Sequence, residues 1–251
     1  MKLLFIPNWN GHLFLQEYND KSISTLYEKV KFENKKLLKI EKNNIERTNK
    51  LIEKEFLESY NKESFVLSIT GDHSNSYPLV RAFSKNNKIS LKSFKLVIFD
   101  AHPDVEVSTS SVSHEDYLRN LIEDNVVKPE DIYLFGIRTF SRTEFEYLQK
   151  KKVNFWSISD VLRNKDKVKE VLNSIKEDIY LSIDIDVLDP DAAPGTYYRE
   201  WCGLYIDELL EFIEAIKLNV KSCDITEYYK EKDENNITEK NVLKLIEKFT
   251  N

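Results

Sequence analysis

The sequence predicts an α/β fold of three layers, in which helices cover both faces of a mostly parallel central sheet. From Phe65 onward, short apolar runs alternate with segments of helical spacing, which is typical of a parallel sheet. Several of these runs are β-branched and apolar, as expected for strands buried on both faces. At 251 residues the chain can bury one sizeable core, and no linker or internal repeat interrupts it. We therefore expect one domain over residues 1–251.

The predicted strands are apolar runs that end at a polar turn. The first lies at residues 1–7, a segment that is too short for a signal peptide. In chain order the predicted strands are 1–7, 65–70, 95–99, 132–137, 153–157, 179–184 and 222–226.

The predicted helices have an apolar face, and several begin at a capping residue. Ser141 and Glu144 form a predicted capping box, Ser113 and Asp116 a predicted capping pair, and Thr238 the cap of the last helix. In chain order the predicted helices are 45–60, 77–83, 115–123, 141–150, 165–174, 206–218 and 238–249.

Composition excludes several classes of partner. No apolar run is long enough to span a bilayer. The net charge of -6 disfavours nucleic acid and anionic membranes as partners. Two cysteines, Cys202 and Cys223, do not make a disulfide framework, so a reducing, cytoplasmic location is expected.

The most informative stretch is the apolar run 180–190, which carries Asp184 and Asp186. Alternation along a strand would place both carboxylates on one face. A buried carboxylate pair repels itself and is costly to desolvate unless a cation holds it. Asp189 and Pro190 then form a turn signal, so the stretch predicts a strand that ends in a charged site.

Two other predicted strands end in the same way. The run 65–70 continues into Gly71-Asp72-His73-Ser74, and the run 95–99 continues into Asp100-Ala101-His102-Pro103-Asp104. Because the carboxyl ends of parallel strands line one edge, where ligands bind, we expect one cluster there. Its expected members are His73, Asp100, His102, Asp104, Asp184 and Asp186. His12, in the polar loop after the first strand, is instead expected to face solvent.

The chemistry of this cluster points to two metal ions. Its four carboxylates carry four negative charges, which two divalent cations would cancel. Mixed carboxylate and imidazole ligands suit manganese, iron or zinc, and the high oxygen content favours manganese. Two metals roughly 3.5–4 Å apart can share a bridging water and lower its pKa towards about 7, which provides a hydroxide nucleophile.

These three motifs, in this order, resemble the metal motifs of the arginase/agmatinase (ureohydrolase) family. The resemblance runs from Phe65 to Tyr228 and covers most of the chain. It implies a three-layer α/β/α fold and a di-manganese site, that is, two Mn²⁺ per chain. By this resemblance His73, Asp100, Asp104 and Asp184 would hold one metal, and Asp100, His102, Asp184 and Asp186 the other, with Asp100 and Asp184 bridging.

Two further positions match the family. His114 falls where the family has a proton-shuttling histidine, and with an ordinary pKa of about 6.5 it can protonate a departing amine. Glu227 falls where the family has a glutamate that grips the guanidinium, a planar cation that a carboxylate suits. The alternatives are an ordinary surface histidine and an ordinary exposed glutamate. Together with Asp104, these two residues are expected to be catalytic.

The substrate is expected to be a guanidino compound without a free α-carboxylate, such as agmatine or a peptide-embedded arginine. Where arginases hold the α-carboxylate with a short polar residue, this chain has Glu106, whose charge would repel it. Ser141 takes the place of the aspartate that arginases use for the α-amino group. The family's Gly- and Pro-rich segment near the mouth of the site is replaced by the aromatic loop 197–202, which could pack against a larger ligand.

The leading hypothesis is thus a di-manganese hydrolase that cleaves a guanidino group to urea and an amine. The alternatives are a free-arginine arginase, a deacetylase-like amidohydrolase with one zinc, and a non-catalytic binding protein on the same fold. Family members are commonly trimers or hexamers, so a homo-oligomer is possible by resemblance.

Overall fold

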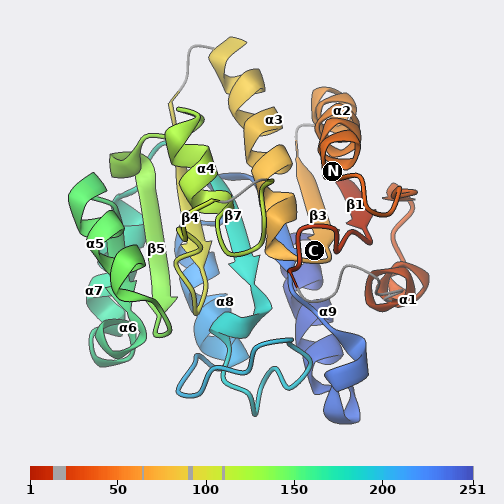
Figure 1. The fold of residues 1–251 in the computed structure, drawn as a ribbon. Helices are drawn as coiled ribbons and strands as arrows, with labels where there is room; N and C mark the ends of the chain where they lie inside the picture. The colour runs from red at the N-terminus through yellow and green to blue at the C-terminus, as the bar shows by residue number, and fades with distance from the viewer. Residues whose placement is uncertain (14–20, 64, 90–92, 109–110, 251) are drawn as a thin grey trace.

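The computed structural model describes residues 1–13, 21–63, 65–89, 93–108 and 111–250. Within them, eight strands form one sheet in the order β2-β1-β3-β8-β7-β4-β5-β6 (Figure 1). All recorded pairings are parallel, which confirms the predicted class. The strands are β1 (Lys2–Ile6), β2 (Lys35–Leu37), β3 (Val66–Thr70), β4 (Phe94–Phe99), β5 (Ile132–Ile137), β6 (Asn154–Ser157), β7 (Asp178–Asp184) and β8 (Val220–Thr226).

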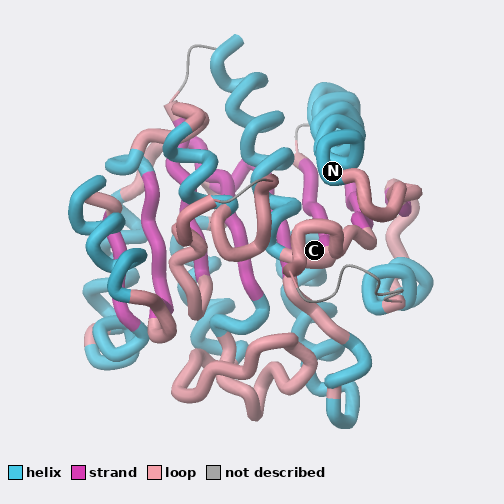
Figure 2. The backbone as a smooth tube through the Cα atoms, viewed as in Figure 1, coloured by secondary structure: helices cyan, strands magenta, loops and turns pink. Residues whose placement is uncertain are grey.

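Helices cover both faces of the sheet, so the predicted three-layer arrangement is confirmed (Figure 2). One face is covered by α2 (Ile45–Glu63), α3 (Ser76–Ile89), α4 (Tyr117–Glu123) and α5 (Arg142–Lys151). The other is covered by α1 (Ser22–Lys29), α6 (Ile158–Arg163), α7 (Lys165–Ser174), α8 (Ile206–Ile216) and α9 (Ile237–Thr250).

Strand β1 shows how the sheet separates two apolar cores. Leu3 and Phe5 belong to the cluster under α8 and α9, whereas Leu4 and Ile6 belong to the cluster under α2 and α3. All four side chains are fully buried. Burial of each such side chain stabilises the fold by about 1.5–3 kcal/mol, which is why the strand has no polar face.

Among the α-helices and strands of the described residues, α1, β2 and α6 lie outside the predicted set. β2 has three residues and, in the described part of the chain, pairs with β1 at the edge of the sheet. α6 has six residues and begins at a capping box in which Ser157 Oγ accepts from the Asp160 amide at 3.2 Å. Elements of three to eight residues leave little periodicity in a sequence.

The capping box that begins α5 is confirmed. The Glu144 amide donates to Ser141 Oγ at 3.1 Å, and the Ser141 amide donates to Glu144 Oε2 at 2.8 Å. The predicted capping pair of Ser113 and Asp116 forms a different hydrogen bond from the one expected of a helix cap. There the backbone amide of Ser113 donates to Asp116 Oδ1 at 2.7 Å, and α4 begins at Tyr117.

The prediction that Thr238 caps the last helix is wrong, because α9 already begins at Ile237. The amides of Thr238 and Glu239 both donate to the carboxylate of Asp233 at 2.9 Å. A 3-10 turn at Glu234–Asn236 lets a carboxylate several residues earlier reach the helix start. The Thr238 hydroxyl is used elsewhere, and accepts from the Gly195 amide at 2.7 Å.

The carboxyl ends of the strands lie along one edge of the sheet. β3, β8, β7 and β4 are consecutive in the sheet, so the segments that follow them are neighbours in space. The long loop between β7 and α8 passes beyond this edge (Figures 1 and 2). In the part of the chain that the structure describes, the helices are all too short or too polar to cross a membrane.

Candidate active site

The predicted cluster forms at the carboxyl ends of β3, β4 and β7. His73 begins a 3-10 turn after β3, Asp100 follows β4, and Asp184 is the last residue of β7. Asp186 does not lie on the strand, so the expectation that strand alternation aligns it with Asp184 is wrong. It lies in the 3-10 turn Ile185–Val187, where the Asp186 amide donates to Asp184 Oδ1 at 2.8 Å. The turn brings the second carboxylate back to the same site.

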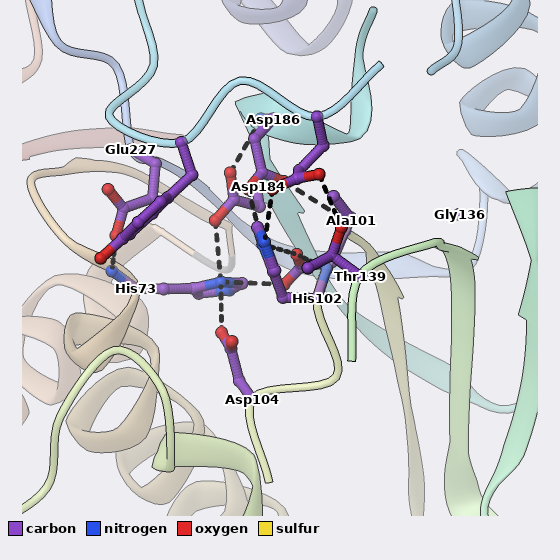
Figure 3. A network of polar contacts seen from close by, with 12 residues as sticks. His73, Ala101, His102, Asp104, Gly136, Thr139, Asp184, Asp186 and Glu227 are labelled. Carbon is purple, nitrogen blue, oxygen red and sulfur yellow. Dashed lines mark hydrogen bonds and ion pairs between the residues drawn. The ribbon is translucent and has the colours of Figure 1, made fainter. Parts of the chain in front are cut away.

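One nitrogen of His73 faces three carboxylates. Its Nδ1 lies 3.1 Å from Asp100 Oδ2, 3.2 Å from Asp104 Oδ2 and 3.1 Å from Asp184 Oδ2 (Figure 3). These oxygens converge on a single point of the imidazole edge. A neutral nitrogen lone pair at this point would be repelled, so the arrangement needs a positive charge there.

The other nitrogen of His73 fixes which tautomer is present when the ring is neutral. Its Nε2 lies 3.0 Å from Ser182 Oγ, and that hydroxyl donates its hydrogen to Asp224 Oδ1 at 2.6 Å. Ser182 can therefore only accept from Nε2, which leaves the Nδ1 lone pair directed at the carboxylates. Orientation of a histidine by a hydrogen bond from its second nitrogen is common among metal-binding histidines.

A second group lies beside the first and shares Asp100 with it. His102 Nδ1 is 2.9 Å from Asp186 Oδ2 and 3.8 Å from Asp100 Oδ1. In each of two trios, His73 with Asp100 and Asp184, and Asp100 with His102 and Asp186, the ligand atoms lie within 4.8 Å of one another. The structure thus brings all six predicted cluster residues together, and Asp104 joins through His73.

The electrostatics of the cluster require cations. Burial and repulsion by its carboxylate neighbours raise the pKa of Asp100 well above its usual range. Burial and the charge of Asp186 raise the pKa of Asp184 to about 7. Burial alone would raise the pKa of Asp186 as well, but the charge and hydrogen bond of His102, with Arg138, lower it to about 2.

Two buried atoms of the cluster have no hydrogen-bond partner among the described residues, namely His73 Nδ1 and Asp100 Oδ2. Both side chains are 1% exposed, so water does not compensate them at the surface. Oxygen and imidazole donors of this kind are suitable ligands for a divalent transition metal. The residues present therefore fit a metal centre.

Glu227 lies against this cluster, in the segment that follows β8. Its Oε1 accepts a hydrogen bond from the His73 amide at 2.8 Å, and its own amide donates to the Gly71 carbonyl at 2.8 Å. Its backbone has a positive φ of 64°, which is strained for a residue with a side chain. Burial, with the charges of Asp184 and Asp72, raises the pKa of Glu227 well above its usual range.

The cluster forms the base of a pocket of about 340 Å³. Its walls hold Glu106, Glu115, Glu144 and Glu200, and the described residues that line it include no lysine or arginine. The lining also includes Glu227, two threonines, three aromatic residues, and the histidine and serine predicted for the site: Thr139, Thr196, Phe140, Tyr197, Tyr198, His114 and Ser141. Glu106 and Ser141, both predicted at the substrate, thus lie on the pocket wall.

A sequence model of the arginase family matches residues 12–250. The chain belongs to the arginase family. This confirms the resemblance read from the three motifs. An agmatinase of Bacillus cereus is 33% identical over 190 residues, which is 73% of this chain and 62% of the agmatinase. An arginase of Staphylococcus aureus is 30% identical over 225 residues, or 80% of this chain and 72% of the arginase.

Solved structures of arginase-family proteins share the fold. The agmatine ureohydrolase of Thermoplasma volcanium superposes with a TM-score of 0.84 at 25% identity, over 98% of this chain and 87% of that one. The formimidoylglutamase of Bacillus subtilis superposes with a TM-score of 0.88 at 21% identity, over 99% of this chain and 85% of the formimidoylglutamase. The match to the Bacillus cereus agmatinase spans 62% of that protein, less than two thirds of its length.

Three residues of this arginase-family site were not predicted. Arg138, after β5, donates to the Asp186 carbonyl at 2.5 Å and to the Glu200 carbonyl at 3.0 Å, so it ties the long loop to the cluster. Glu200 Oε2 accepts from Thr139 Oγ1 at 2.6 Å, and its Oε1 lies 3.6 Å from His102 Nε2. The only available sequence signal was an arginine directly after a predicted strand. The position of Glu200 depends on how its loop folds back.

His12 is the third such residue, and its predicted solvent-facing position is wrong. Its side chain is 0% exposed, and its ring stacks on that of His114. The surrounding aromatic residues Tyr197 and Trp9, rather than solvent, contact it. A loop histidine is buried here because the long loop between β7 and α8 covers it, which no local pattern indicates.

Proposed function

We propose that this protein is a metal-dependent ureohydrolase that hydrolyses a guanidino C–N bond to give urea and an amine. The observation that carries the proposal is the position of His73. Its Nδ1 faces three carboxylates, and its amide holds Glu227 at the same pocket. His73 therefore belongs both to the proposed metal site, through its side chain, and to the proposed guanidinium site, through its backbone amide. We propose residues 1–251 as one ureohydrolase-like domain.

The proposed cofactor is two Mn²⁺ per chain, held by the side chains of His73, Asp100, His102, Asp104, Asp184 and Asp186. Their four carboxylates are balanced by two divalent cations. When bound, two such ions lower the pKa of a water molecule towards about 7 and so provide the nucleophile. Asp100 belongs to both ligand trios, which supports a bridging role.

The remaining steps are assigned to side chains of the pocket. The Glu227 carboxylate accepts N–H bonds from the guanidinium and orients the central carbon towards the cluster. His114 gives a proton from Nε2 to the departing amine, since an amine is a poor leaving group until it is protonated. Buried, preorganised groups of this kind are effective because they need not reorganise during the reaction.

The charge of the pocket wall supports a substrate without a carboxylate. After the cluster is balanced by metal and Glu227 by the guanidinium, the wall glutamates Glu106, Glu115, Glu144 and Glu200 remain, with no lysine or arginine among the described lining residues. A carboxylate at the far end of the substrate would be repelled, whereas an ammonium or a neutral amide would be accepted. Ser141 Oγ already accepts from the Glu144 amide, as a helix cap.

We therefore propose agmatine, or an arginine side chain within a peptide, as the substrate, with free arginine as the alternative. The test is urea release from manganese-loaded protein with equal concentrations of agmatine, arginine and a capped arginine peptide. The highest kcat/KM for free arginine would reject this substrate class. The absence of urea from all three would reject the proposed activity.

Metal content separates the other candidate functions. About two manganese ions per chain with urea release supports the ureohydrolase. One zinc per chain with amide hydrolysis would indicate the deacetylase-like alternative, and no bound metal after manganese loading would indicate a binding protein. A homo-oligomer, trimer or hexamer, and a cytoplasmic location are further proposals, which sedimentation of the purified protein and fractionation of the source cells would test.

A further inference from the structure

His114, which lines the pocket, is stacked on the buried ring of His12. The two ring centroids are 4.3 Å apart, and the ring planes differ by 10°. Tyr198 lies beside the pair, with its ring centroid 6.2 Å from each imidazole and its plane within 15° of both. The close stack on His12 restricts rotation of the His114 ring, because a turn of that ring would bring its edge against His12.

The residue before His12 restricts His114 in a second way. The Gly11 carbonyl oxygen lies 3.2 Å from His114 Nδ1 and also accepts from the His114 amide at 3.2 Å. Because a carbonyl can only accept, Nδ1 carries the hydrogen, and Nε2 is the nitrogen that gains or loses a proton. Nε2 is buried and has no hydrogen-bond partner among the described residues. The nearest recorded charge is Glu115 Oε1, at 3.8 Å.

The turn at Gly11 is itself held by the first metal motif. The Gly11 amide donates to Asp72 Oδ2 at 3.2 Å, and Asp72 directly precedes His73. A Cβ atom at position 11 would lie 2.0 Å from Ser74 Oγ, so only glycine allows this approach. The position of the His12 ring is thus tied to the same segment that positions the metal cluster.

Burial, together with nearby charges, keeps His12 neutral. Burial, with the charges of His114 and Lys232, lowers the pKa of His12 to about 3. Asp72 and Glu115 are the acidic groups that face His114, and Lys232 faces His12. A neutral ring can stack on His114 in both of its protonation states, whereas a second imidazolium would repel the charged form.

We propose that His12 is a positioning residue, which holds the His114 ring so that Nε2 is directed into the pocket for proton transfer. The proposal rests on the proposed function, because it takes His114 as the proton donor. The proposal goes beyond the proposed function because it assigns a role to His12, a residue that touches neither metal nor substrate. What His12 supplies is a flat, uncharged surface on one face of the imidazole.

Two substitutions of similar size separate this role from simple packing. His12→Phe keeps a flat ring and should retain kcat within a few-fold. His12→Leu fills the space without a flat ring and should lower kcat about tenfold or more, a part of the roughly 10²–10⁴-fold that a general acid contributes. KM and bound manganese should stay unchanged in both. Leu13→Ala, at an exposed neighbour, is the control.

A second measurement does not need turnover. Nitrogen-edited NMR of histidine-labelled protein, loaded with diamagnetic zinc, reports the tautomer and the pKa of His114. We expect the Nδ1–H tautomer in the wild type and in His12→Phe, and a mixture with a shifted pKa in His12→Leu. An Nε2–H tautomer in the wild type would overturn the proposal. So would a His12→Leu variant whose His114 tautomer, His114 pKa and kcat are all unchanged. An equal loss of kcat in His12→Phe and His12→Leu would also overturn it. If the wild type released no urea, the proposed function would fail, and the spectra would still decide the role of His12.

Discussion

Glu227 Oε1 accepts a hydrogen bond from the backbone amide of His73 at 2.8 Å. This bond joins the end of β8 to the first residue of the metal cluster, across two neighbouring strands of the sheet. In the proposed mechanism it sets the distance between the guanidinium and the metal centre. A shift of either segment would move both groups, so binding of substrate and binding of metal are expected to be coupled through this contact.

Removal of a cluster carboxylate should abolish hydrolysis and reduce the amount of bound metal. In Asp184→Asn or Asp104→Ala, three carboxylates remain to balance two divalent cations, and one oxygen facing His73 Nδ1 is lost or loses its charge. We expect bound manganese to fall below two per chain and urea release to reach background. Asp191→Asn, at an exposed carboxylate in the nearby loop, is the matched control. Near-wild-type metal and turnover in either cluster variant would contradict the two-metal assignment.

His114→Asn should reduce turnover without loss of metal. The loss should be about 10²–10⁴-fold, because a positioned general acid contributes that much. The pH profile should lose the limb that reports protonation of the acid. Metal analysis and a steady-state pH series check this, with Glu115→Gln at the half-exposed neighbouring carboxylate for comparison. A rate within a few-fold of wild type at every pH would remove His114 from the mechanism.

Glu227→Gln should weaken substrate binding more than it affects metal. The amide oxygen can still accept from the His73 amide, but the charge that pairs with the guanidinium is lost. Hydrogen bonds to charged groups contribute about 1.5–3 kcal/mol, so kcat/KM should fall tenfold or more. The matched control is Glu231→Gln, an exposed glutamate nearby in the chain. An unchanged kcat/KM with agmatine would place Glu227 away from the substrate.

The charge at the far end of the substrate should determine selectivity. Agmatine, N-butylguanidine and 4-guanidinobutyrate have nearly the same length and end in an ammonium, a methyl group and a carboxylate. We expect kcat/KM to decrease in that order, by about fivefold or more per step if each charge contact contributes ~1 kcal/mol. Glu200→Gln should narrow the gap between the first two compounds. Equal values for all three would mean that the acidic wall does not contact the substrate.

Metal-free protein should lose stability as the pH rises towards neutrality. Burial and Asp186 raise the pKa of Asp184 to about 7, so the folded state holds a proton that the unfolded state releases near its ordinary value. The resulting stabilisation is present at low pH and is lost as the pH rises through about 7. Thermal unfolding of chelator-treated protein, measured from low pH to above pH ~7, checks the sign of this change in stability. Manganese should reverse the loss above pH ~7, because it replaces the proton.

The candidate metal residues could be predicted from the sequence because their signal is local. An apolar run that ends in Asp or His marks a buried strand with a charged carboxyl end, and parallel strands bring such ends to one edge. This pattern predicts that His73, Asp100 and Asp184 lie together, and the structure places them in one cluster. The helix cap at Ser141 was predictable for the same reason, since its partner lies three residues away.

The tertiary structure decided the features that depend on contacts between distant segments. His12 is buried because the loop after β7 covers it, and Glu200 reaches His102 because Arg138 holds that loop against the cluster. Asp186 reaches the site through a 3-10 turn, not through strand alternation. Burial and loop placement are properties of the whole packed chain, and the free energy that fixes them comes from contacts that local spacing does not encode.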